Sequence, residues 1–309
     1  METREQYPIT LVTAYFELGG KPGCPGRENP YPRWIRNFLP NARWPLVIFC
    51  DEQSLDMLRE ARGDKPAVYH VTRPEEFYAW RYLDDLKRQS FPAWEGTEFC
   101  IARSLVWHEK HHFLRQALSE NPFGSEMLFW CDIGQFRHSS DAPWWPWQSA
   151  LWKLLKWFIL YEDIEWPNLE VCRSLPADKV ILIRWPAIDG EDVGILSAKF
   201  FGGAVNSSRR WCDAYYRHLE EQRQSGDFTW IEEFAMRSCW LRRRELAHVI
   251  PHNFVLFRGN CGPDYTWHFL NGRRFPWKHF RQDYSWHFLN GGRFPWKYFC
   301  RRIFSGLVR

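Results

Sequence analysis

Short apolar runs separated by longer amphipathic stretches dominate the first 250 residues of the chain. Most of the runs are continuous rather than alternating, which predicts parallel strands buried on both faces. Strands that alternate with helices predict an α/β fold with a mainly parallel sheet and helices on both faces. The predicted strands span residues 9–16, 45–50, 67–72, 127–132 and 179–185, and the predicted helices span 53–62, 98–120, 148–162, 207–224 and 226–246.

Two acidic residues follow predicted strands directly. Asp51 and Asp132 stand where the strands 45–50 and 127–132 end. Ligands of doubly wound α/β folds bind outside the carboxyl ends of the strands, so both carboxylates are candidate site residues. Gly202 and Gly203 precede the helix 207–224. Either they let backbone approach a ligand between Phe201 and Ala204, or they only make a tight turn.

The predicted helix 98–120 carries a lysine on its apolar face. Lys110 falls inside an apolar stripe, whereas His108 and His112 are expected to face away from it. A lysine on a buried face needs a partner or a route to water. Lys110 therefore either snorkels to solvent or reaches an anion, such as a diphosphate, at the sheet edge. The stripe consists of Val106, Trp107, Phe113, Leu114, Ala117 and Leu118.

The same helix contains the pattern H-E-x-x-H at His108, Glu109 and His112. Such a pattern places two histidines one turn apart, where they can bind zinc beside a glutamate that acts as a general base. No H-x-x-G-x-x-H extension follows, and the two histidines are predicted to lie away from the buried face. A zinc metalloprotease therefore stays an alternative rather than the leading hypothesis.

Composition narrows the class of protein and its surroundings. The chain has 309 residues, 45% hydrophobic and 25% charged, which is typical of globular proteins, and 18% aromatic, which suits either an aromatic core or the binding of sugar rings and bases. Nine cysteines without a C-x-x-C pair, and no apolar leader or run of membrane-spanning length, predict reduced thiols in a cytoplasmic protein. No nucleic-acid partner is expected.

The C-terminal part differs from the rest in charge and in pattern. From Leu241 to Arg309 the chain has 13 Lys+Arg against 3 Asp+Glu, and residues 264–281 recur as 283–300 at an offset of 19 with 14 of 18 positions identical. We therefore divide the chain into a domain of residues 1–250 and a basic aromatic appendage of residues 251–309. Segment 264–302 is a candidate for peripheral contact with an anionic membrane.

Several blocks of the chain resemble the HtrL/YibB family of glycosyltransferase-like proteins. The most specific block is "VWHEKHHFLRQALSENPFGSEMLFWCDIGQFR" (106–137), which carries that family's W-x-E-K helix, its NPF-S turn and its W-D-G-R strand end. "TLVTAYFELG", "YPRWIRNFL" and "PLVIFCDE" resemble the family's opening strand, helix and second strand. "SAKFFGGAVNSSRRWCDAYYRHLEE" resembles its FFGG loop and following helix. The resemblance covers about residues 9–250.

The resemblance implies an A-type glycosyltransferase fold and an enzyme that transfers a sugar from a nucleotide-sugar donor to a glycan or glycolipid acceptor. The departing nucleoside diphosphate gains negative charge, which a cation, lysine or arginine must stabilise. Seven residues are the implied donor-binding set: Thr13, Tyr15, Arg33, Lys110, Arg137, Gly202 and Gly203.

In related transferases a D-x-D motif at a strand end binds Mn²⁺ or Mg²⁺ on the donor diphosphate. Asp132 matches the first carboxylate and is the expected metal ligand, but Gly134 replaces the second. Asp132 would then hold the metal with diphosphate oxygens and a distant ligand such as His252. This departure leaves a non-catalytic protein with the same fold as a further alternative.

Two glutamates begin the last predicted helix of the family-like region. Glu232 and Glu233 stand where the family often carries an acidic residue followed by Gln. With Asp132 they form the expected catalytic set, in which a carboxylate orients the acceptor hydroxyl or takes its proton. The other interpretation is that both charges only complement the helix dipole.

Overall fold

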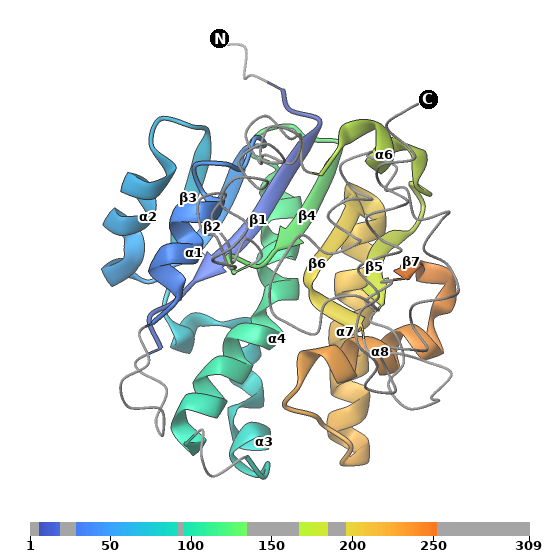
Figure 1. The fold of residues 1–309 in the computed structure, drawn as a ribbon. Helices are drawn as coiled ribbons and strands as arrows, with labels where there is room; N and C mark the ends of the chain where they lie inside the picture. Colours follow the sequence, from blue (N-terminus) through green and yellow to red (C-terminus); the bar gives the residue numbers. More distant parts are fainter. Residues whose placement is uncertain (1–5, 19–28, 92–95, 135–166, 185–195, 252–309) are drawn as a thin grey trace, which may run out of the picture.

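The computed structural model describes residues 6–18, 29–91, 96–134, 167–184 and 196–251, and these form one seven-stranded sheet covered by helices. The strand order is β3-β2-β1-β4-β6-β5-β7 (Figure 1). The strands are β1 (Ile9–Tyr15), β2 (Leu46–Cys50), β3 (Ala67–Val71), β4 (Met127–Cys131), β5 (Val180–Arg184), β6 (Leu196–Ala204) and β7 (Ala247–Pro251).

The sheet is mixed but mostly parallel. β1 pairs in parallel with β2 and β4, β2 with β3, and β5 with β7, whereas β6 is antiparallel to both β4 and β5. The α/β class and the five predicted strands are therefore confirmed. Strands β6 and β7 were not predicted, and in β6 the glycine pair conceals the strand because glycine inside a strand is unfavourable.

Helices cover both faces of the sheet. One face packs against α3 (Leu83–Lys87), α4 (Thr97–Glu120), α7 (Val205–Ser225) and α8 (Glu232–Arg242). The other face packs against α1 (Tyr31–Phe38), α2 (Leu55–Arg62) and α6 (Leu169–Ser174). Side chains of β1 alternate between these cores, which explains the continuous apolar run of a strand buried on both sides.

The last helix is shorter than the predicted 226–246. Gly226 ends α7 in the left-handed conformation at φ 80°, and Ile231 just before α8 is extended. Residues between them therefore leave the helical path, and α8 begins only at Glu232. The chain leaves the helix again at Arg243, before the short 3-10 turn η4 (Arg244–Leu246).

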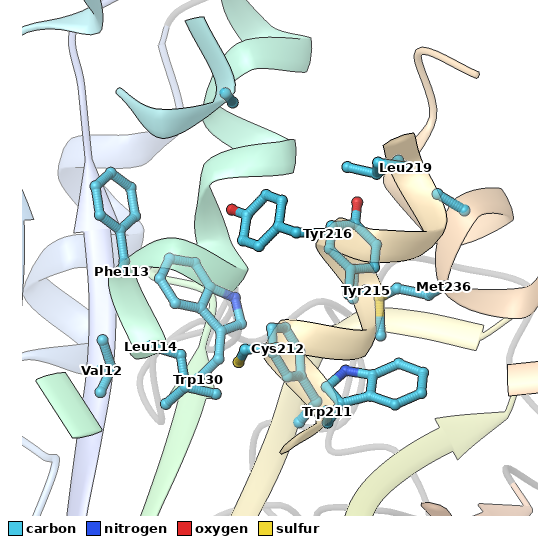
Figure 2. Packing of buried hydrophobic residues seen from close by; sticks show 14 of the residues in the cluster. Val12, Phe113, Leu114, Trp130, Trp211, Cys212, Tyr215, Tyr216, Leu219 and Met236 are labelled. Atoms are coloured by element: carbon cyan, nitrogen blue, oxygen red, sulfur yellow. The ribbon is translucent and has the colours of Figure 1, made fainter. Parts of the chain in front are cut away.

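Helix α4 is buried on more sides than its predicted stripe. His108 and His111 have no exposed surface, because α7 packs along this helix and places Tyr215 and Tyr216 beside it (Figure 2). The prediction that His108 faces away from the buried side is therefore wrong. Trp107, which the stripe includes, is only half-buried.

Gly202 and Gly203 lie inside β6 and not in a turn. Both have positive φ, 147° and 150°, and Gly202 faces Phe129 of β4. A Cβ at Gly202 would lie 2.3 Å from the carbonyl oxygen of Leu128, so only glycine permits this strand contact. Close packing between strands accounts for this glycine without a ligand.

Some predicted features fall outside the described part of the chain. These are the helix 148–162, Arg137, His252, and the appendage 251–309 beyond the end of β7. No disulfide joins the six cysteines of the described ranges. In the same ranges no helix is long and apolar enough to cross a membrane.

Candidate functional site

The parallel strands converge on one edge of the sheet where acidic residues gather. After β1 the chain adds β2 and then β3 on one side of β1. It later adds β4 on the other side of β1, so the order in which strands are added to the sheet reverses between β1 and β4. This topological switch point is the usual ligand site of an open α/β sheet. Glu17 follows β1, Asp51 follows β2, and Asp132 follows β4 at this edge.

Asp51 is used to hold the backbone of this edge. Its Oδ1 accepts the backbone N–H of Ser54 at 2.8 Å, and its Oδ2 accepts the backbone N–H of Glu17 at 2.6 Å. The carboxylate thus caps the 3-10 turn η1 (Glu52–Ser54) and ties the loop after β1 to β2. Among the candidate carboxylates of this edge, Asp51 has a structural role.

Lys110 of α4 connects two other carboxylates. Its Nζ lies 2.5 Å from Oε1 of Glu232 and 3.0 Å from Oδ1 of Asp132. The carbonyl oxygen of Ala198 in β6 lies 3.5 Å from the same nitrogen. An ammonium has three N–H donors, and these acceptors account for all of them. We call Lys110, Asp132 and Glu232 the charge triad.

Each member of the charge triad comes from a different element. Trp130 in β4 and Asp132 just after it lie two residues apart along the extended chain and so point to the same face, toward α4. The indole Nε1 of Trp130 donates to Oδ1 of Asp132 at 2.8 Å, which fixes this carboxylate on a second side. Glu232 enters from the first turn of α8. The triad therefore forms only when α4, β4 and α8 are packed together.

Burial governs the electrostatics of the triad. Burial alone would lower the pKa of Lys110, but Asp132 and Glu232 outweigh it and hold that pKa above its ordinary value. Burial raises the pKa of Glu232 to about 8, against the opposing effect of the Lys110 ammonium. Lys110 therefore stays charged at neutral pH, whereas the raised pKa of Glu232 means that its carboxyl is largely protonated there.

Exposure separates the three side chains by what they can touch. The side chain of Asp132 is 26% exposed, whereas those of Lys110 and Glu232 are 6% and 5% exposed. Asp132 is therefore the member that can meet a ligand at the sheet edge. Lys110 and Glu232 are buried, and Lys110 holds the Asp132 carboxylate in position from inside the protein.

Glu233 lies next to the triad without joining it. Its Oε1 accepts the backbone N–H of Ala198 at 3.4 Å, and its side chain is only half-buried. Burial raises the pKa of this carboxyl, while Lys110 opposes the rise. A carboxylate with a raised pKa and partial exposure suits proton transfer better than the fully buried Glu232.

Gly134 occupies the position of the missing second carboxylate for a steric reason. A Cβ at Gly134 would lie 3.0 Å from Cε3 of Trp34 in α1. An aspartate here would require the Trp34 ring to move, so the packing of α1 against the end of β4 disfavours a D-x-D pair.

The metal expected at Asp132 finds few ligands in the described residues. No three His, Cys, Asp or Glu side chains come together there to hold an ion. Oδ1 of Asp132 accepts from Trp130 and lies 3.0 Å from the Lys110 ammonium, Oδ2 accepts from Lys110 at 3.4 Å, and the ammonium would repel a cation placed beside them. These residues do not fit a metal site on their own, and we derive no step through a metal.

The H-E-x-x-H residues are engaged in packing. His108 contacts Tyr215 Oη at 2.7 Å through Nδ1 and the Thr229 carbonyl oxygen at 3.0 Å through Nε2. The two carboxylate oxygens of Glu109 accept the backbone N–H groups of Tyr78 and Ala79. Burial lowers the pKa of His108 to about 4. Both ring nitrogens and both carboxylate oxygens are thus occupied, which disfavours the zinc alternative.

The other predicted donor-binding residues in the described ranges do not gather at one place. Tyr15 lies at the switch-point edge, where its hydroxyl donates to Glu17 at 2.6 Å, whereas Thr13 is buried in the middle of β1. Arg33 is exposed on α1, and no hydrogen bond or ion pair joins it to the triad within the described part of the chain. Gly202 lies opposite Phe129, away from the strand end that bears Asp132.

Two features of the site were not predicted. Trp130 was missed although it stands two residues before Asp132, the spacing that puts strand residues on one face. The carbonyl of Ala198 had no sequence signal because β6 was not recognised.

A scan against protein-family models and a search of the curated proteins found no match to this chain.

Proposed function

We propose that this chain is a glycosyltransferase that moves a sugar from a nucleotide-sugar donor to a glycan or glycolipid acceptor. The observation that carries the proposal is the charge triad. It fixes one partly exposed carboxylate, Asp132, at the switch point where α/β sheets bind their ligands. An A-type glycosyltransferase arrangement of the sheet is part of the proposal.

Lys110 and three carboxylate residues have different roles in this proposal. Asp132 contacts the donor at the end of β4, because it is the exposed member of the triad. Lys110 and Glu232 are positioning residues, since their mutual contact is buried and the donors of Lys110 are taken by Glu232, Asp132 and the Ala198 carbonyl. Glu233 takes the proton of the acceptor hydroxyl, because its half-buried carboxyl has a raised pKa.

The predicted metal concerns Asp132, and the predicted membrane contact concerns the C-terminal appendage. Asp132 is the residue that would hold a Mn²⁺ or Mg²⁺ ion, which would supply positive charge for the departing diphosphate, but the described residues form no metal site on their own and no step of the proposal depends on the ion. Segment 264–302, outside the described residues, would bring the cytoplasmic enzyme to anionic lipid.

Release of nucleoside diphosphate from a panel of nucleotide sugars tests the proposal. We expect turnover with one donor and a loss of about a hundredfold in Asp132→Asn, which keeps the shape of the side chain but removes its charge. Asp213→Asn, at a half-exposed position on α7, is the matched control and should leave turnover unchanged. Equal release by wild type and Asp132→Asn, or no release from any donor, would overturn the proposal. Donor binding without release would identify a non-catalytic protein.

A further inference from the structure

Two donors of different kinds hold the carboxylate of Asp132. The indole Nε1 of Trp130 donates to Oδ1 at 2.8 Å, and the ammonium of Lys110 lies 3.0 Å from the same oxygen and 3.4 Å from Oδ2. An ammonium is a compact charge whose three donors rotate, and this one is shared with Glu232. An indole has a single N–H, which lies in the plane of its ring. Lys110 therefore supplies charge to Asp132, whereas Trp130 supplies a fixed direction.

The direction of this N–H is set by packing of the Trp130 ring. Trp130 is only 2% exposed. Its ring is nearly parallel to that of Phe113 in α4, at 18° and 6.3 Å between centroids, and to that of Phe201 in β6, at 27° and 6.4 Å (Figure 2 labels Trp130 and Phe113). The Lys110 nitrogen lies 5.8 Å from the centroid of the same ring. In a close-packed interior such a ring keeps one rotamer, so its N–H keeps one direction.

The main chain of Asp132 is fixed as well, but its carboxylate is not fixed by the backbone. The backbone N–H of Asp132 donates to the Lys199 carbonyl at 2.8 Å, which continues the pairing of β4 with β6 by one residue. Rotation about the side-chain bonds remains, and the last of these bonds has only a broad preference in an aspartate. Without the indole N–H, both carboxylate oxygens would be free to turn toward the Lys110 ammonium and away from the sheet edge.

We propose that Trp130 is a positioning residue for donor binding, because its N–H holds the partly exposed Asp132 carboxylate in one orientation at the end of β4. This inference rests on the proposed sugar transfer and adds to it a residue that touches neither donor nor acceptor. A carboxylate accepts hydrogen bonds along the directions of its lone pairs, so a carboxylate that turns loses contacts to a donor held by the rest of the site.

Isothermal titration of the full-length protein with UDP, GDP, ADP and CDP, each with and without Mn²⁺, tests this role. Trp130→Phe should weaken the nucleotide that wild type binds by about tenfold, the effect of losing one hydrogen bond to a charged group. Trp44→Phe is the matched control. Trp44 is also buried and donates to the Pro167 carbonyl at 2.9 Å, but it packs in the core on the other face of the sheet. This control should bind like wild type.

A second variant isolates the N–H from the ring, because phenylalanine also removes part of the packing. β-(3-Benzothienyl)alanine at position 130 keeps a fused ring of similar shape and has sulfur in place of the N–H. It should weaken nucleotide binding as much as Trp130→Phe does. A merely structural role would lower the melting temperature at both tryptophan positions and leave the dissociation constants of the folded proteins alike. Melting curves of all variants establish that they fold.

The outcomes separate this inference from the proposed function. Weaker binding in both variants at position 130, with unchanged binding in Trp44→Phe, supports the positioning role. Wild-type affinity in the benzothienyl variant, or an equal loss in Trp44→Phe, overturns that role and leaves the donor site at Asp132 in place. No binding of any nucleotide to wild type overturns the donor site and the role of Trp130 together.

Discussion

The ammonium of Lys110 lies 2.5 Å from Oε1 of Glu232, a residue 122 positions away in the chain, and both side chains are almost fully buried. Oε2 of Glu232 is buried and accepts no hydrogen bond within the described part of the chain. Glu232 therefore depends on Lys110 for its stabilisation, and the packing of α8 on α4 depends on both.

Removing Lys110 should destabilise the protein strongly. Lys110→Met removes the contact of the buried Glu232 carboxyl and the cation beside Asp132, which costs about 3–5 kcal/mol in free energy of unfolding. The double variant Lys110→Met/Glu232→Leu should recover part of this loss, because no buried carboxyl remains at position 232. Urea unfolding of both single variants and of the double variant measures the coupling. Strictly additive losses would contradict a direct interaction.

The raised pKa of Glu232 predicts a pH-dependent stability difference. The folded protein holds this proton up to about pH 8, whereas the carboxyl ordinarily has a pKa of 4.5. Its stabilisation is fully present below about pH 4.5 and is lost as pH rises to about 8. Glu232→Gln keeps the neutral form, so the melting temperature of wild type relative to this variant should fall by a few degrees across that window.

An exposed carboxylate supplies the control for this titration. Glu170→Gln makes the same exchange at an exposed position on α6, and its melting temperature is compared with that of wild type over the same pH window. A wild-type minus Glu232→Gln difference that varies no more than the difference for this control would contradict the raised pKa.

Gly202→Ala should lower stability through backbone strain and a clash with β4. The new Cβ would meet Leu128 O at 2.3 Å and Phe129 Cα at 2.6 Å at φ 147°, a cost of about 3 kcal/mol or more. Gly226→Ala also has positive φ, 80°, but no atom within 4 Å, so it should cost only about 1 kcal/mol. Equal losses in denaturant unfolding would show that strand packing does not explain Gly202.

The sequence predicted most of the fold because its signals are local. Continuous apolar runs identified five strands, and the end of β4 identified Asp132. The charge triad required more, because Lys110 and Glu232 meet only through tertiary packing of α4 against α8. Lys110 was recognised by its place on an apolar face, and the structure places the carboxylates of Asp132 and Glu232 against its ammonium. Likewise, the burial of His108 comes from α7, which no periodicity in α4 reveals.

The melting temperature should not depend on zinc if the H-E-x-x-H residues only pack. His108 and Glu109 already bond to Tyr215, Thr229, Tyr78 and Ala79. We therefore expect dialysis against a chelator to leave the melting temperature unchanged and metal analysis to find no stoichiometric zinc. One zinc per chain, removed with a fall in melting temperature, would restore the metalloprotease alternative.

Nucleotide binding at Asp132 tests the central claim most directly. Melting curves are measured with UDP, GDP, ADP and CDP, each with and without Mn²⁺, on wild type, Asp132→Asn and Asp213→Asn. At about a hundred times its Kd, one diphosphate should raise the melting temperature of wild type and the Asp213 variant by roughly 5 °C or more. The same ligand should shift Asp132→Asn by much less. An equal shift in Asp132→Asn, or no shift with any nucleotide, would contradict a donor site at the end of β4.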